Sequence, residues 1–273
     1  MAKPSTQVNT WEAKLLKSAT IAARVEAKVS EQKPNISVTG GQISVAGQNL
    51  GSEIVIAALD QAFVNVYYQG AYDPNNIVNP DCFAIATVNE DGELVVQDAW
   101  DGTEGSELKP HKNSANRQFD TCAKCPMNQF GSAAQGAGKA CQNTRRIAAI
   151  RIGETVNNKV SLYDADKIAA QEIGFLKIPA TGIKSWSAFV SKLSNVLGKP
   201  TWAMATRLAS QIVPGKTYFL PTFAADAAIP DKLMPAVYKQ VEQAQQEIAW
   251  AFAPKVEDDS SKGPKKTPRR KYT

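Results

Sequence analysis

Apolar and polar residues alternate along much of the chain, a period-two pattern that is typical of half-buried β-strands. Residues 35–39 and 42–46 alternate in this way on either side of Gly40-Gly41, which predicts a β-hairpin. A second hairpin is expected around the turn signal Asn89-Glu90-Asp91-Gly92. The other strands that the pattern predicts are 53–59, 62–68, 83–88, 93–100, 145–152, 160–163, 174–179, 202–212 and 216–223.

Helical periodicity, with apolar residues three or four positions apart, occurs in residues 10–31, 185–197 and 231–252. Thr10 and Ser185 are the expected N-caps of the first two helices. Short strands separated by turn signals favour a closed or partly closed antiparallel barrel. We therefore expect an α+β fold with an OB-like antiparallel β-barrel core, an N-terminal helix and a C-terminal helix.

The cysteines suggest a metal site. Cys122 and Cys125 form a CxxC pair, and Cys141 follows after a glycine-containing gap of fifteen residues. This is the ligand spacing of zinc knuckles and ribbons, although the second half of the usual second pair is missing. Cys82, the remaining cysteine of the chain, is the natural fourth ligand. We expect these four thiolates to bind one structural Zn²⁺.

Other interpretations of the cysteines remain open. His111, the single histidine of the chain, is the alternate fourth ligand. Cys125-Pro126 also occurs in ferredoxin-type Fe–S sites, although their tight run of cysteines is absent. A CxxC pair can instead be a redox pair or simply two free thiols.

The residues around the cysteines resemble a family of bacteriophage early-region proteins that are regarded as single-stranded-DNA-binding proteins. The string is CxxCPxNxFGS…GKAC…RR, beginning at Cys122 and ending at Arg145-Arg146, and further matches place the resemblance over about residues 36–225. The further matches are Pro80, Cys82, Asp91-Gly92, Val38-Thr39-Gly40-Gly41, Tyr72-Asp73-Pro74-Asn75 and Leu176-Lys177-Ile178-Pro179-Ala180-Thr181. The resemblance implies a phage protein that acts in DNA replication.

Composition and charge divide the chain into three parts. We expect residues 1–34 to form an amphipathic arm that can support self-association, and residues 35–254 to form the core, with the zinc module at about 109–145. Residues 255–273 are rich in Pro, Ser, Gly and Lys and are expected to be a disordered basic tail. The tail holds seven basic and three acidic residues, which accounts for four of the five net positive charges.

The remaining positive charge is concentrated near the cysteines. Residues 109–151 hold eight basic residues against Asp120 alone. Basic residues interleaved with aromatic rings are the pattern with which proteins bind the phosphates and stack the bases of single strands. The residues expected to contact nucleic acid are Lys124, Lys139, Arg145, Arg146 and Arg151 on phosphates, and Phe130 and Trp100 on bases.

These observations predict a protein that coats single-stranded DNA and is not an enzyme. One histidine makes a catalytic triad improbable, and the chain has no phosphate-binding GxxxxGK[ST] loop. A protein-interaction factor for a phage or host replication or transcription enzyme is the first alternative, and an Fe–S-containing nucleic-acid enzyme is the second. The absence of a long apolar run and of an apolar signal core predicts a cytoplasmic protein with no membrane partner.

Overall fold

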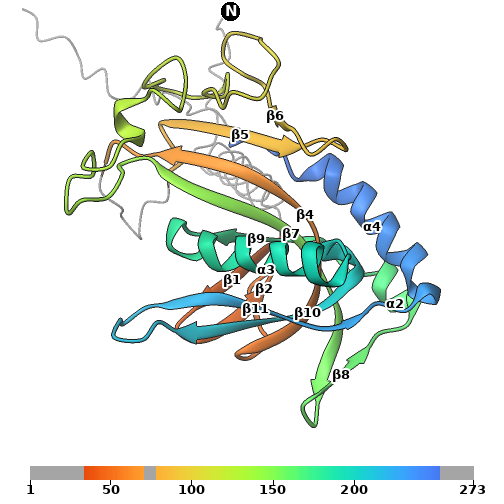
Figure 1. Cartoon of the computed structure of the whole chain (residues 1–273). Helices are drawn as coiled ribbons and strands as arrows, with labels where there is room; N and C mark the ends of the chain where they lie inside the picture. Colours follow the sequence, from red (N-terminus) through yellow and green to blue (C-terminus); the bar gives the residue numbers. More distant parts are fainter. Residues whose placement is uncertain (1–33, 71–77, 253–273) are drawn as a thin grey trace, which may run out of the picture. The chain divides into compact units, whose positions relative to one another are not determined.

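The computed structural model of the chain describes residues 34–70 and 78–252 (Figure 1). The helix expected at 10–31 and the tail expected at 255–273 lie outside these residues. Within them, no helix has the length and apolar character needed to cross a lipid bilayer.

The described residues form one mixed α+β structure with an eleven-stranded sheet and three α-helices. The strands are β1 (Asn35–Thr39), β2 (Gln42–Val45), β3 (Gln48–Asn49), β4 (Glu53–Tyr67), β5 (Cys82–Val88), β6 (Leu94–Val96), β7 (Gln142–Val156), β8 (Lys159–Leu162), β9 (Gly174–Ile178), β10 (Met204–Ile212) and β11 (Phe219–Ala228). The helices are α2 (Ala165–Ala169), α3 (Ile183–Leu197) and α4 (Met234–Glu247).

The chain divides into two compact units. Unit 1 comprises the described residues 34–60 and 146–246, and unit 2 comprises the described residues of 61–145 and 247–252. The cysteine module expected at 109–145 belongs to unit 2. Because β4 and β7 each cross a boundary between these ranges, both strands contribute residues to each unit.

The sheet is open and mostly antiparallel. Its hydrogen-bonded order is β11-β10-β4-β7-β9-β1-β2-β3, with β5 and β6 attached beside β4 and β8 attached to β7. The pairing of β1 with β9 is parallel, with Asn35 opposite Phe175.

The predicted barrel does not close. In unit 1 the two ends of the sheet approach each other, since a Cβ placed on Gly41 would lie 3.1 Å from the Phe219 ring. Among the described residues, however, no ladder joins β11 to β1, β2 or β3. The predicted strands 53–59 and 62–68 are in fact one strand, β4, which pairs with β10 at Glu53–Ile56 and with β5 at Phe63–Tyr67. The turn that a small barrel would need between residues 53–59 and 62–68 is therefore missing.

The core of unit 1 lies between the sheet and α3 (Figure 1). Trp186, Phe189 and Leu193 form the buried stripe of α3, and Phe223 of β11 packs against Trp186 with ring centroids 4.8 Å apart. Leu197, which the helical period also assigns to this stripe, is 44% exposed. The helix begins at Ile183 after a 3-10 turn, two residues before the expected cap at Ser185. It ends at a left-handed Gly198.

Unit 2 combines a small antiparallel sheet with a long irregular segment. Its part of β4 pairs with β5, and β5 pairs with β6 across the predicted Asn89–Gly92 turn. From residue 97 to residue 141 the backbone has only an isolated bridge between Ala99 and His111 and a 3-10 turn at Pro126–Asn128. This segment carries three of the four cysteines.

Candidate functional site

The four cysteines come from separate parts of unit 2. Cys82 begins β5 opposite Tyr67, Cys122 and Cys125 precede the 3-10 turn, and Cys141 immediately precedes β7. All four side chains are buried, and all four are free thiols.

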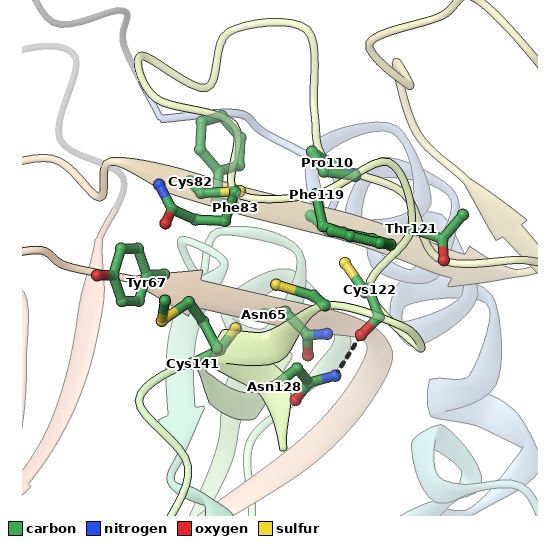
Figure 2. A pocket seen from close by; sticks show the side chains of 14 residues that line it. Asn65, Tyr67, Cys82, Phe83, Pro110, Phe119, Thr121, Cys122, Asn128 and Cys141 are labelled. Atoms are coloured by element: carbon green, nitrogen blue, oxygen red, sulfur yellow. Dashed lines mark hydrogen bonds between the residues drawn. The ribbon is translucent and has the colours of Figure 1, made fainter. Parts of the chain in front are cut away.

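One small cavity brings these cysteines together. All four line it, and in Figure 2 the labelled side chains of Cys82, Cys122 and Cys141 surround the same space. The cavity has a volume of about 20 Å³. A single water needs at least about 10–15 Å³ measured in this way, so the space suits one small occupant.

Hydrogen bonds fix the backbone of the cysteine loop. The backbone N–H of Cys122 donates to the carbonyl of Leu108 at 2.8 Å, and that of Cys141 donates to the carbonyl of Met127 at 2.7 Å. The buried Asn128 side chain donates to the carbonyl of Cys122 at 2.7 Å (Figure 2). The loop is thus anchored at Cys122, where the CxxC turn begins, and at Cys141, just before β7.

Burial governs the chemistry of the thiols. Burial, with a smaller contribution from the neighbouring cysteines, raises the pKa of Cys122 and of Cys141 to about 12. Burial also raises the pKa of Cys82, whereas hydrogen bonds from the Gln118 backbone N–H and the Ser114 hydroxyl lower it by a smaller amount. These three thiols are therefore neutral at pH 7 and poor nucleophiles in the metal-free chain, which weakens the redox interpretation.

The sulfurs are not gathered at metal-binding distances. In the described part of the chain, no three His, Cys, Asp or Glu side chains form a group that could hold a metal ion as they stand. His111 does not line the cysteine cavity. Its ring is buried and stacks on Phe83 with centroids 4.7 Å apart, and its Nδ1 accepts from the Asn113 N–H at 3.0 Å.

The basic residues of unit 2 fall into two groups. Lys109 pairs with Asp101 at 2.7 Å, Lys112 pairs with Asp98 at 2.6 Å, and Arg117 lies 3.8 Å from Asp120. In contrast, Lys124, Lys139 and Arg145 have no carboxylate partner among the described residues. The second group is therefore available to an external anion.

Aromatic rings accompany two of these three cations. The ammonium of Lys139 lies 5.1 Å from the centroid of Phe130, whose side chain is 82% exposed. The guanidinium of Arg145 lies 3.7 Å from the centroid of Phe63. Unit 2 thus presents the exposed Phe130 ring next to Lys139, a cation without a carboxylate partner among the described residues.

The other predicted contact residues are placed differently. Arg117 covers the Trp100 ring at 3.5 Å, and the Trp100 indole N–H donates to the Asp120 carbonyl at 3.1 Å. Arg146 and Arg151 belong to unit 1. Arg146 is 6% exposed, and burial lowers its pKa to about 9, so little of its side chain is open to a phosphate in this structure. Arg151 lies 3.9 Å from Glu154.

Sequence reasoning missed the polar residues that support the cysteines. Asn65 is buried among the apolar and aromatic residues 62–67 of β4, where it contacts the Cys122 thiol and accepts from the Asn143 amide at 2.9 Å. An isolated asparagine in an apolar strand was the available signal, because a buried amide needs partners.

No protein family, curated protein or solved structure that was compared with this chain matches it.

Proposed function

We propose that this protein binds single-stranded DNA through Lys124, Lys139, Arg145 and Phe130 of unit 2. One observation carries the proposal: these three cations are free of carboxylate partners within the described residues, while the other described basic residues of unit 2 are paired. The resemblance to phage single-stranded-DNA-binding proteins points to the same function and to the cytoplasm of an infected bacterial cell.

The two kinds of side chain would contact different parts of a strand. Cations without internal partners can bind phosphates and release the condensed counterions of the nucleic acid. The exposed Phe130 ring offers a face on which a base can stack, a contact worth about 1–3 kcal/mol. Bases of a duplex are already stacked on each other, so an exposed ring favours single strands.

The proposal is one of binding without catalysis. The single histidine of the chain is buried against Phe83 and is therefore poorly placed to transfer a proton to or from a substrate. Phage or host replication proteins would be partners of the DNA complex, and self-association would follow if several copies coat one strand.

The test is a titration of fluorescent oligo(dT) and of a hairpin duplex at several salt concentrations. The variant combines Lys124→Ala, Lys139→Ala and Arg145→Ala. Its matched control combines Lys109→Ala and Lys112→Ala, which remove cations that Asp101 and Asp98 already neutralise.

We expect tighter binding to oligo(dT) than to the duplex. Each phosphate contact removed should reduce the slope of log affinity against log salt by about 0.7, while the control keeps the wild-type slope. Wild-type binding by the triple variant would place the DNA site elsewhere. A wild-type chain that binds neither nucleic acid would instead favour the protein-interaction factor.

A further inference from the structure

We infer that unit 2 binds one Zn²⁺ through Cys82, Cys122, Cys125 and Cys141, and that this ion fixes the loop that carries Phe130 and Lys139. This inference does not depend on the proposed DNA binding. The first argument is convergence: every cysteine of the chain lines one cavity, although Cys82 and Cys141 are separated by 59 residues in the sequence.

The size and state of the cavity agree with a single ion. It holds about 20 Å³, all four thiols are buried, and none is in a disulfide. A zinc ion with four sulfur ligands at about 2.3 Å requires neighbouring sulfurs about 3.8 Å apart. Because no such group is assembled among the described residues, the four sulfurs must move closer together when the ion binds.

Hydrogen-bond donors lie close to the sulfurs of Cys82 and Cys122, although a neutral thiol does not require a donor. Asn65 hydrogen-bonds to Cys122, and the Gln118 N–H and the Ser114 hydroxyl hydrogen-bond to Cys82. The buried hydroxyl oxygen of Thr121, which also lines the cavity, has no hydrogen-bond partner in the structure. Donors aimed at sulfur stabilise thiolates, and such outer contacts orient the ligands of metal sites.

The charge balance of binding is simple. Four thiols lose four protons to solvent and one Zn²⁺ enters, which leaves a tetrathiolate centre with a net charge of −2. Nearby cations offset part of this charge, because Arg117 lies near Cys82 and Lys139 lies near Cys141.

Four protein ligands leave no open coordination position, so the ion is structural. Its effect falls on residues 126–140, the chain between the second and third cysteines of the loop. That segment carries Phe130 and Lys139, and its only regular element is the Pro126–Asn128 turn. Cross-linking both ends of the segment to one ion restricts the positions of both side chains.

The first experiment measures the metal content of the purified full-length chain by mass spectrometry. We expect one zinc per chain, no zinc in Cys122→Ser and Cys125→Ser, and wild-type zinc in His111→Gln as the control. Stoichiometric iron with brown colour, or zinc retained in both serine variants, overturns the inference. Loss of zinc in His111→Gln with retention in Cys82→Ser overturns the assignment of the fourth ligand.

A second experiment does not rely on variants that fold poorly. Wild-type protein is stripped with a chelator and titrated with Co²⁺, whose tetrahedral thiolate complexes absorb strongly in the visible range. We expect saturation at one equivalent, displacement by Zn²⁺, and slower tryptic cleavage after Lys124 and Lys139 in the zinc form. Absence of the Co²⁺ absorption overturns the inference. Oligo(dT) binding is measured separately, so a failure of either proposal can be recognised.

Discussion

The guanidinium carbon of Arg145 lies 3.7 Å from the centroid of the Phe63 ring, and the Arg145 Nη1 donates to the Thr144 carbonyl at 3.2 Å. The ring and this hydrogen bond together hold the planar group in one orientation. Lysine has the same charge but cannot stack in this way. Replacing Arg145 with lysine therefore separates the effect of its charge on DNA binding from the effect of its fixed orientation.

We predict that Arg145→Lys keeps the wild-type salt slope for oligo(dT) but weakens binding. Arg145→Ala should weaken binding further and reduce the slope by about 0.7. Fluorescence anisotropy at four or more salt concentrations measures both quantities, with Lys112→Ala as the control. Equal slopes for Arg145→Ala and wild type would show that Arg145 does not contact a phosphate.

Phe130→Ala should change binding without changing stability. Because the ring is 82% exposed, its removal leaves no core cavity, and the free energy of unfolding should stay within about 0.5 kcal/mol of wild type. Affinity for oligo(dT) should fall by about 1–3 kcal/mol with the salt slope unchanged. Tyr218→Ala removes an exposed ring of unit 1 and should alter neither quantity. A Phe130→Ala protein with full affinity would exclude base stacking at this position.

Arg207 should stabilise unit 1 in a way that lysine cannot replace. Its Nε and Nη2 donate to one carboxylate oxygen of Asp226 at 2.9 and 2.7 Å, and Nη2 also donates to the Asn158 carbonyl at 2.9 Å. We expect Arg207→Lys to lower the free energy of unfolding by about 1.5–3 kcal/mol in urea denaturation. Lys192→Ala, an exposed change on α3, is the control. Equal urea midpoints for Arg207→Lys and wild type would contradict the expectation.

Gly153→Ala should destabilise unit 1 through a backbone clash. A Cβ at this position would lie 2.5 Å from the Ser161 carbonyl oxygen in the β7–β8 ladder. Backbone atoms cannot rotate away, so we expect a loss of about 1–3 kcal/mol in the free energy of unfolding. Gly138→Ala, whose nearest contact is 3.9 Å from Ala133, should stay within about 0.5 kcal/mol of wild type. A similar thermal midpoint for both variants would contradict this account.

The local parts of the fold could be predicted from sequence because their signals are local. Gly40-Gly41 and the Asn89–Gly92 turn each mark a hairpin that the structure contains. The sequence predicted two strands, 53–59 and 62–68, with a break at residues 60 and 61, yet β4 continues through these residues. The sequence shows the polar interruption but does not show that the strand changes partners there, from β10 to β5. Barrel closure depends on the same long-range pairings, which is why it was mispredicted.

The candidate site was predictable to a similar extent. Spacing grouped Cys122, Cys125 and Cys141, and the count of cysteines added Cys82. Side chains alternate between the two faces of a strand, so Arg145 and Arg146 must face opposite sides, but this rule does not tell which side is buried. That choice depends on the packing of β7, which only the three-dimensional structure provides; Arg146 is the buried member.

The parallel pair of β1 and β9 has a kinetic consequence. Asn35 is aligned with Phe175, so the two partners are 140 residues apart in the chain. At about 5–20 residues per second, a ribosome makes the second partner about 7–28 s after the first. The hairpin of β1 and β2 can form at once, but Ile36 must wait for β9 to cover it. A nascent chain therefore exposes an unpaired, partly apolar strand edge for many seconds, and this is where chaperones or aggregation would compete with folding.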